Sequence, residues 1–188
     1  RGNSCRRMRN PMIVVLEGPD FAGKSTVAEA LARQFGGSIV ANGPPPPDVI
    51  LRDHYLDQVY AAAAADHLII FDRLHVGELI YGPIYRGASR LSEDDVMSIE
   101  HALNAIDALK VHVDASDDVL LERLHGPRGD DMVRHDEQLL SIAHQYRALL
   151  ATDGLLPDWE SISTGDSASV IAREVQRRKT IRDNPDRG

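Results

Sequence analysis

Residues 18–25 read Gly-Pro-Asp-Phe-Ala-Gly-Lys-Ser and match the pattern Gly-x-x-x-x-Gly-Lys-Ser/Thr. The apolar run 12–16 precedes them and a helical pattern follows, so the loop would join a buried strand to the start of a helix. There, backbone N–H groups converge on a phosphate, Lys24 supplies a positive charge and the Ser25 hydroxyl can ligate Mg²⁺. The sequence therefore predicts a triphosphate-binding loop built from Gly18, Ala22, Gly23, Lys24, Ser25 and Thr26.

A second pair of reactive residues, Asp72-Arg73, stands at the end of a predicted strand over residues 67–72. Ligands of open parallel sheets gather at the carboxyl ends of the strands. Asp72 could hold Mg²⁺ or its water there, and Arg73 could clamp an acceptor phosphate through its planar fork. Alone the dipeptide would be an ordinary surface ion pair, but beside a phosphate-binding loop it predicts a catalytic site.

A third segment, residues 123–134, carries Arg123, Arg128 and Arg134 around a Gly-Pro pair, between two predicted helices. Phosphoryl transfer spreads negative charge over oxygens that arginines can stabilise, and a closing loop excludes water. The segment is therefore predicted to be a short arginine-bearing lid. The alternative is a solvated charged loop.

Short apolar runs alternate with amphipathic stretches throughout the chain, which is typical of βαβ units. The pattern predicts an α/β fold in which a parallel five-stranded sheet has helices on both faces. Strands are predicted at 12–17, 38–41, 67–72, 109–114 and 159–163. Helices are predicted at 25–35, from about Leu51 to Ala65, at 92–106, 116–124, 135–150 and 167–179.

The length of 188 residues and the 43% hydrophobic content fit a single domain, which we place at residues 12–180. Residues 1–11 are predicted to be a flexible N-terminal extension and residues 181–188 a frayed tail. The four prolines at 44–47 are interpreted as a stiff connector.

Charge and cysteine content narrow the classes of function. A net charge of −8 argues against a nucleic-acid-coating protein, because such binding needs many basic contacts to phosphates. Cys5 is the only cysteine, so the chain has no disulfide framework, which suits a reducing cytoplasmic location. The early apolar run is too short to predict a membrane span. None of the eight histidines falls in a zinc-ligand pattern, and His75 is expected at most to support a neighbouring site residue.

Taken together, these motifs resemble the thymidylate kinase family of nucleoside monophosphate kinases. Residues 17–26, EGPDFAGKST, follow the family's phosphate loop Glu-Gly-x-Asp-x-Ala-Gly-Lys-Ser-Thr, and Asp72-Arg73 matches its Asp-Arg motif. Residues 80–87, Ile-Tyr-Gly-Pro-Ile-Tyr-Arg-Gly, align with the bacterial pattern Ala-Tyr-Gln-Gly-Gly-Gly-Arg-Gly. The resemblance covers residues 12–165.

The resemblance implies a Mg²⁺-dependent transfer of the γ-phosphoryl group of ATP to a deoxynucleoside monophosphate, by default thymidine monophosphate (dTMP), and a homodimer. It implies that Asp20 reaches the acceptor sugar, that Arg73 holds its phosphate, and that Tyr81 lies against sugar or base, with Arg86 in the same segment. Some members carry a catalytic arginine where this chain has Phe21. That role would then fall to Arg128 first and Arg123 next.

Two departures from the family pattern leave the acceptor open. Gly82 stands where a glutamine helps to read the pyrimidine, and Asn42-Gly43 with the prolines replaces an Arg-Glu-Pro-Gly segment. Losing a base-reading group relaxes or redirects specificity. Arg52 and Tyr55 are candidate base contacts, against an ordinary surface role.

Other reactions also remain open. A kinase for a nucleoside, a modified nucleotide or a hydroxymethylated base in DNA is one alternative. A nucleotide-binding switch is another, although the sequence has no Asn-Lys-x-Asp guanine signature.

Overall fold

The computed structural model describes residues 12–126, 133–151, 154–163 and 167–183. Its centre is a five-stranded parallel sheet in the order β2-β3-β1-β4-β5. The strands are β1 (Ile13–Glu17), β2 (Ser38–Ala41), β3 (Ile69–Asp72), β4 (Leu109–Asp114) and β5 (Glu160–Ser163). This arrangement confirms the predicted fold class and all the predicted strands.

The order of the strands brings distant motifs to one edge of the sheet. β1 is buried along its whole length, and it lies between β3 and β4. In the parallel register Leu16 pairs with Asp72, and Glu17 pairs with His112. The phosphate loop after β1 and the Asp72-Arg73 pair after β3 therefore leave the sheet side by side.

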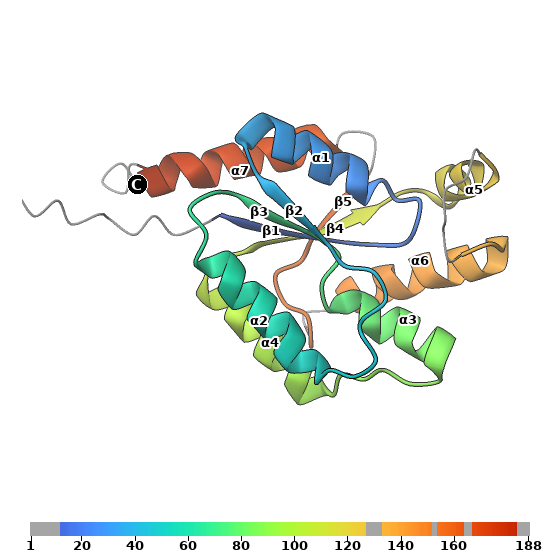
Figure 1. Cartoon of the computed structure of the whole chain (residues 1–188). Coiled ribbons are helices and arrows are strands. Elements are labelled where there is room, and N and C mark those ends of the chain that lie inside the picture. Colours follow the sequence, from blue (N-terminus) through green and yellow to red (C-terminus); the bar gives the residue numbers. More distant parts are fainter. Residues whose placement is uncertain (1–11, 127–132, 152–153, 164–166, 184–188) are drawn as a thin grey trace, which may run out of the picture.

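Helices cover both faces of the sheet (Figure 1). Helices α1 and α7 lie on one face, while α2, α3, α4 and α6 lie on the other. The bounds are α1 (Lys24–Phe35), α2 (Leu51–Ala63), α3 (Val76–Arg86), α4 (Glu93–Ala105), α5 (Asp117–His125), α6 (Asp136–Leu150) and α7 (Ser167–Asp183). Six of these helices lie within a few residues of the predicted positions.

Helix α3 was not predicted from the sequence. Gly77, Gly82 and Pro83 interrupt its helical signal, because glycine and proline are the weakest helix formers. A distant side chain starts the helix instead: Glu17 Oε1 accepts hydrogen bonds from the N–H groups of Leu74 at 2.8 Å and Val76 at 3.1 Å. A tertiary contact thus satisfies N–H groups that a local capping residue would otherwise serve.

One predicted boundary needs a correction. Helix α7 continues to Asp183, so residues 181–183 are helical rather than part of a frayed tail. Arg123, the first residue of the predicted lid, lies inside α5, in agreement with the predicted helix 116–124. The extension 1–11, the central lid residues 127–132 and the end of the chain from 184 lie outside the described residues.

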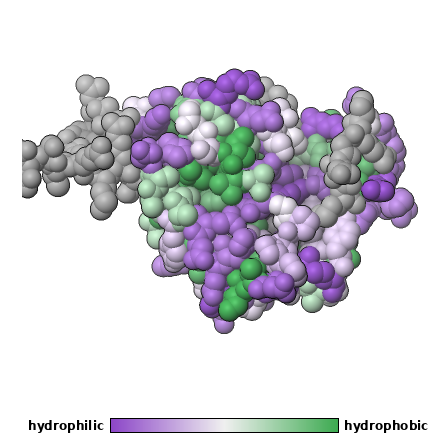
Figure 2. Space-filling model, viewed as in Figure 1, coloured by the Kyte–Doolittle hydropathy of each residue, from purple (hydrophilic) through white to green (hydrophobic). Residues whose placement is uncertain are grey.

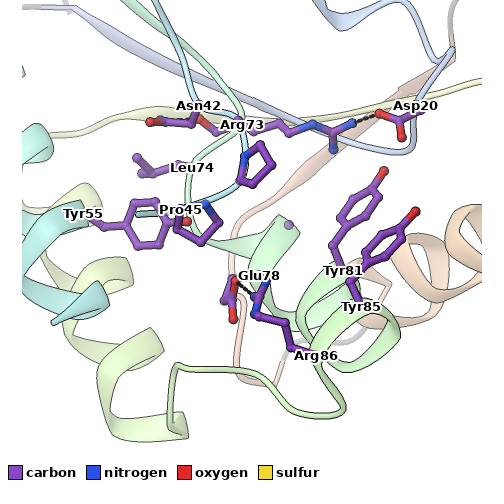
Figure 3. Close-up of a pocket in the computed structure, with 13 residues that line it drawn as sticks. Asp20, Asn42, Pro45, Tyr55, Arg73, Leu74, Glu78, Tyr81, Tyr85 and Arg86 are labelled. Carbon is purple, nitrogen blue, oxygen red and sulfur yellow. Dashed lines mark hydrogen bonds and ion pairs between the residues drawn. The ribbon is translucent and has the colours of Figure 1, made fainter. Parts of the chain in front are cut away.

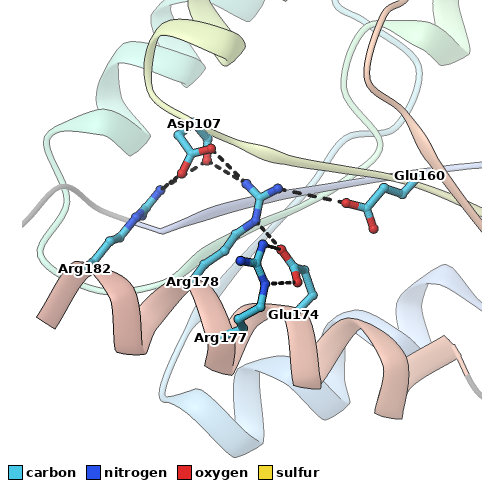
Figure 4. A network of polar contacts seen from close by, with 6 residues as sticks. All are labelled: Asp107, Glu160, Glu174, Arg177, Arg178 and Arg182. Atoms are coloured by element: carbon cyan, nitrogen blue, oxygen red, sulfur yellow. Dashed lines mark hydrogen bonds and ion pairs between the residues drawn. The ribbon is translucent and has the colours of Figure 1, made fainter. Parts of the chain in front are cut away.

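Ion pairs attach the C-terminal half of α7 to the turn between α4 and β4 (Figure 4). The Arg178 guanidinium lies 3.1 Å from an Asp107 carboxylate oxygen and 2.8 Å from Glu174, and Arg182 also reaches Asp107 at 3.1 Å. Exposed pairs of this kind each contribute little free energy, but a network orients the helix. None of these residues lines the pocket described below, so they offer control positions for mutagenesis.

The surface shown in Figure 2 is mostly hydrophilic, with apolar areas separated from one another by polar ones. The large exposed apolar side chains of the described residues are Ile39, Ile50, Tyr60, Tyr85, Met97 and Ile181. Within the described ranges, no helix has the length and apolar character needed to cross a membrane.

Candidate active site

The phosphate loop requires glycine at its first position. Gly18 has φ +147°, and a Cβ atom there would lie 2.1 Å from the Val113 carbonyl oxygen of β4. At the other end of the loop, Gly23 has φ 93° and supplies no side-chain cap to α1. The first N–H groups of α1 therefore point into the loop without a capping side chain, which is the geometry that favours an anion.

Lys24 begins α1 and bends back over the loop. Its Nζ donates a hydrogen bond to the Pro19 carbonyl oxygen at 2.6 Å, and the side chain is buried. Burial and the nearby positive charge of Arg73 lower the pKa of Lys24 from its ordinary 10.5 to about 7, against the opposing effect of Asp20, Asp72 and Glu17. An arriving polyphosphate would restore the charged form, because the anion stabilises the ammonium group.

This pKa predicts that binding of ATP takes up a proton. At pH 8 most Lys24 side chains in the free protein are neutral, since this pH is above a pKa of about 7. A bound triphosphate raises that pKa, so up to one proton should enter per ATP at pH 8 and almost none at pH 6, where Lys24 is already charged. Calorimetry in buffers of different ionisation enthalpy measures this uptake. A Lys24→Met variant should lose it, and equal uptake by the variant would contradict the assignment.

Ser25 and Asp72 lie together beside the loop. The Ser25 hydroxyl donates to Asp72 Oδ2 at 2.6 Å, which links the start of α1 to the end of β3. A hydroxyl and a carboxylate are oxygen ligands of the kind Mg²⁺ prefers. Both predicted metal residues therefore meet at one point, and they fit Mg²⁺ carried by a nucleotide.

Arg73 connects the phosphate loop to the pocket beyond it. The residue has φ 69°, and its Nη1 donates to the Gly18 carbonyl oxygen at 2.7 Å and the Tyr146 hydroxyl at 3.1 Å. Its Nη2 pairs with the Asp20 carboxylate, and its guanidinium carbon lies 5.0 Å from the centre of the Tyr81 ring. Burial opposes the charge, but Tyr146, Tyr81 and Asp20 raise the pKa of Arg73 well above its ordinary value. The guanidinium is therefore a permanent, oriented positive charge.

Two buried residues that sequence reasoning missed hold Arg73 in place. The Tyr146 hydroxyl donates to Glu17 Oε2 at 3.1 Å and accepts from Arg73, while Glu17 Oε1 holds the backbone that follows Arg73. Glu17 was visible as a carboxylate at the end of an apolar run. No local sequence pattern indicates Tyr146, because its partner Glu17 lies 129 positions away in the chain.

A cavity of about 400 Å³ opens beside Arg73 (Figure 3). One buried polar atom in its wall, Asp20 Oδ2, has no hydrogen-bond partner in the described part of the chain. Such an atom is costly unless a ligand satisfies it. The lining residues are Asp20, Asn42, Gly43, Pro44, Pro45, Tyr55, Arg73, Leu74, Gly77, Glu78, Tyr81, Tyr85 and Arg86.

The cavity contains most of the predicted acceptor-binding residues. Asp20, Arg73, Tyr81, Tyr55 and Arg86 all line it. The exception is Arg52, which is not among the lining residues and pairs instead with Asp53 at 2.7 Å and Asp95 at 3.7 Å on the surface. The cavity therefore gives no support to Arg52 as a base contact, and that role stays a prediction.

The proline segment is a wall of the cavity and more than a connector. Pro44 and Pro45 line the cavity, and Arg90 donates to the carbonyl oxygens of Pro46 at 2.7 Å and Val49 at 2.6 Å. Prolines have no N–H to donate, so the segment can be held only through its carbonyl oxygens, and the Arg90 guanidinium binds these. Asn42 also joins the wall, since its amide donates to the Arg73 carbonyl oxygen at 3.0 Å.

Of the two predicted lid arginines, Arg128 lies outside the described residues. Arg123 reaches the phosphate loop from α5, where its Nη1 donates to the Phe21 carbonyl oxygen at 2.7 Å. Phe21 stands where some members of the resembled family carry an arginine, and its carbonyl oxygen is bound by an arginine from another element.

His75 is buried behind the site, and its Nε2 lies 2.9 Å from Glu100 Oε1. Glu100 also accepts from Lys110 at 2.6 Å and from the Trp159 indole at 3.1 Å. Burial opposes ionisation of Glu100, but His75 and Lys110 hold its pKa below the ordinary value. Among the described residues, no three or more His, Cys, Asp and Glu side chains gather into a metal site.

Comparison with known proteins gives one relative by sequence. No family model matches the chain. The SPbeta prophage-derived uncharacterized protein YorR of Bacillus subtilis (strain 168) is 29% identical over 165 residues, which cover 87% of this chain and 96% of YorR. The crystal structure of YorR, in complex with phosphorylated GDP, superposes with a TM-score of 0.71 at 25% identity, over 90% of this chain and 96% of that one.

More distant structures share the architecture. Deoxyadenosine kinase from M. mycoides with bound dATP has a TM-score of 0.58 at 14% identity, covering 88% of this chain and all of that one. Thymidylate kinase from Candida albicans has a TM-score of 0.53 at 14% identity, covering 94% and 93%. The chain has the P-loop kinase fold. An identity of 14% to these two kinases shows the shared fold alone.

Proposed function

We propose that this P-loop kinase-fold protein transfers the γ-phosphoryl group of ATP to a nucleoside monophosphate. The observation that carries the proposal is the continuity of the site. The phosphate loop contacts Arg73 directly, and Arg73 lies at the edge of a nucleotide-sized cavity whose wall holds the unpartnered, buried Asp20 Oδ2. A donor phosphate chain and an acceptor can thus meet at Arg73.

Each residue has a role in positioning or charge neutralisation, which supply most of the catalysis in phosphoryl transfer. Lys24 and the N-terminus of α1 would hold the β- and γ-phosphates of ATP. Ser25 and Asp72 would hold Mg²⁺, which neutralises charge on those phosphates when it is bound. Arg73 would orient the acceptor phosphate for in-line attack, and Asp20 Oδ2 would accept a hydrogen bond from the acceptor sugar.

The acceptor is proposed to be a monophosphate rather than a nucleoside. Arg73 is a permanent positive charge at the junction of loop and cavity, where the acceptor phosphate would lie. The sequence resemblance favours dTMP as the acceptor. The guanine nucleotide bound to YorR favours a guanine acceptor or product as the second candidate.

A coupled assay of ADP release tests the function. Protein, ATP and Mg²⁺ are incubated with each deoxynucleoside monophosphate and, separately, with each deoxynucleoside and a hydroxymethylated duplex. ADP release that depends on one monophosphate supports the proposal. If ADP is released with a nucleoside or with DNA but with no monophosphate, that compound is the acceptor instead. If ADP is released with none of these compounds, the protein is not a kinase of this kind.

The catalytic arginine is proposed to come from the segment 123–134, since Phe21 cannot supply a positive charge. Arg128→Ala should lower kcat by at least about 100-fold while changing KM for either substrate much less, because a charge used in the transition state acts on kcat. Steady-state kinetics of Arg128→Ala and Arg123→Ala measure both constants. If kcat is unchanged in Arg128→Ala and reduced in Arg123→Ala, the role belongs to Arg123.

A homodimer and a cytoplasmic location also remain predictions. Light scattering at the assay concentration measures the oligomeric state.

A further inference from the structure

At the end of the cavity away from Asp20, two side chains of α3 form a charged pair (Figure 3). Glu78 Oε2 pairs with the Arg86 guanidinium, and Glu78 Oε1 accepts the backbone N–H of Arg90 at 2.8 Å. The Glu78 side chain is 1% exposed, whereas that of Arg86 is 37% exposed. A nearly buried carboxylate with fixed orientation therefore faces the cavity beside a guanidinium.

The hydrogen-bonding capacity of this pair is specific. An ionised carboxylate only accepts, with about four lone-pair sites, of which Arg86 and Arg90 use two. Both oxygens of Glu78 thus retain accepting capacity, and Arg86 retains N–H donors beside them. A base that reaches the pair would meet two adjacent acceptors next to a donor.

Among the common bases, the guanine Watson–Crick edge complements this pattern. It carries two adjacent donors, N1–H and the 2-amino group, next to the O6 acceptor. Adenine and cytosine each offer one amino donor beside a ring-nitrogen acceptor, and thymine offers one N–H between two carbonyls. A carboxylate facing those edges would meet at least one acceptor, and two acceptors that face each other repel and leave a hydrogen bond unmade.

The cavity walls next to the pair are suited to a flat ring. Pro44, Pro45, Leu74 and Tyr55 all line the cavity, and they present mainly apolar surface. The buried Tyr55 belongs to α2, while the prolines come from the segment anchored by Arg90. The Arg90 residue therefore holds both the proline wall and, through its N–H, the Glu78 carboxylate.

Gly82 explains why this pair can exist in the chain. A Cβ atom at Gly82 would lie 2.7 Å from Glu78 Oε1 and 3.1 Å from Arg86 Nη2. A glutamine at this position, as in the pattern of the resembled family, would displace the pair. The glycine and the charged pair are thus alternatives in the same space, which links the departure at Gly82 to a different way of reading the base.

We propose that Glu78, oriented by Arg86 and Arg90, is the base-reading residue of the acceptor site and selects a guanine monophosphate. The inference rests on the proposed function, because it assigns the cavity to the acceptor.

The test compares kcat/KM for dGMP, dIMP, dTMP, dAMP and dCMP. dIMP differs from dGMP only by lacking the 2-amino group. The wild-type protein should prefer dGMP and use dIMP roughly 10- to 100-fold less well, the effect of one hydrogen bond to a charged group. The Glu78→Gln variant should lose most of this dGMP/dIMP ratio. Preference for dTMP, or an unchanged ratio in Glu78→Gln, would overturn the assignment.

Matched variants separate base reading from folding. Glu174→Gln makes the same change in a carboxylate paired with Arg177 and Arg178, and it should leave the dGMP/dIMP ratio unchanged. If Glu78→Gln does not fold, as judged by thermal melting, the partly exposed Arg86→Gln replaces it. That variant should lower kcat/KM for dGMP and dIMP alike, since both bases carry O6, and no change in either would contradict the proposal.

The outcomes also distinguish this inference from the proposed function. Turnover with a preferred pyrimidine keeps the kinase and removes the guanine assignment. If no monophosphate is turned over, calorimetric binding of dGMP and dIMP still decides the base assignment. Tighter binding of dGMP that Glu78→Gln abolishes would support it, and equal binding would refute it.

Discussion

Replacing Lys24 with alanine is expected to lower kcat by roughly 10²- to 10³-fold or more, because it removes a preorganised charge from the transferring phosphates. The folded state should survive the change. Burial lowers the pKa of Lys24, so holding this amine out of water costs free energy, and alanine removes that cost. The melting temperature should therefore stay the same or rise.

Steady-state kinetics and thermal melting measure the two effects of Lys24→Ala. Lys179→Ala serves as the control. Lys179 belongs to α7 and lies over the Phe35 ring of α1, with its Nζ 5.8 Å from the ring centre. The control variant should keep wild-type kinetics. A near-wild-type rate for Lys24→Ala would refute the role of Lys24, and a collapsed fold would show that the loop depends on the bond to Pro19.

Arg73→Lys is expected to lower kcat/KM for the acceptor by about 100-fold or more, although the positive charge is kept. The guanidinium contacts Gly18, Tyr146 and Asp20 from one planar group, and a lysine ammonium is a point charge that cannot hold all these directions. A displacement of the acceptor phosphate by about 1 Å is enough for a loss of this size. Binding of ATP alone should change much less.

Kinetics with the acceptor varied and calorimetry with ATP separate these effects. Arg177→Lys is the matched control, because Arg177 pairs with Glu174 on the exposed face of α7 and makes no contact with the cavity. Equal loss of ATP affinity and acceptor efficiency in Arg73→Lys would place Arg73 on the donor instead.

Much of the fold could be predicted because its signals are local. The apolar run 13–16 of β1, the glycine at the end of α1 and the Ser92-Asp95 capping box of α4 are each contained within a few neighbouring residues. Helix α3 could not be predicted this way. Its glycines and proline argue against a helix, and the carboxylate that starts it comes from β1, which lies about 60 residues earlier in the chain.

The phosphate loop and its neighbours could be predicted for the same reason. The loop 18–25 is contiguous, and Ser25 and Asp72 are brought together by adjacent parallel strands, whose carboxyl ends share one edge. The residues that line the cavity were harder to predict. Tyr55 and Arg52 are three residues apart on α2, yet only Tyr55 lines the cavity, and only the packing of α2 decides which side chain points inward.

By itself, the amino-acid sequence determined that this protein has a phosphate-binding loop in a parallel α/β sheet and that Asp72-Arg73 lies beside it. Those features follow from short-range patterns and from the rule that parallel strands end together. The tertiary structure alone decided how the cavity beside Arg73 is built. Glu78 of α3 and the proline segment before α2 line it, Arg90 holds both, and the cavity exists only once α2 and α3 pack on the same face of the sheet.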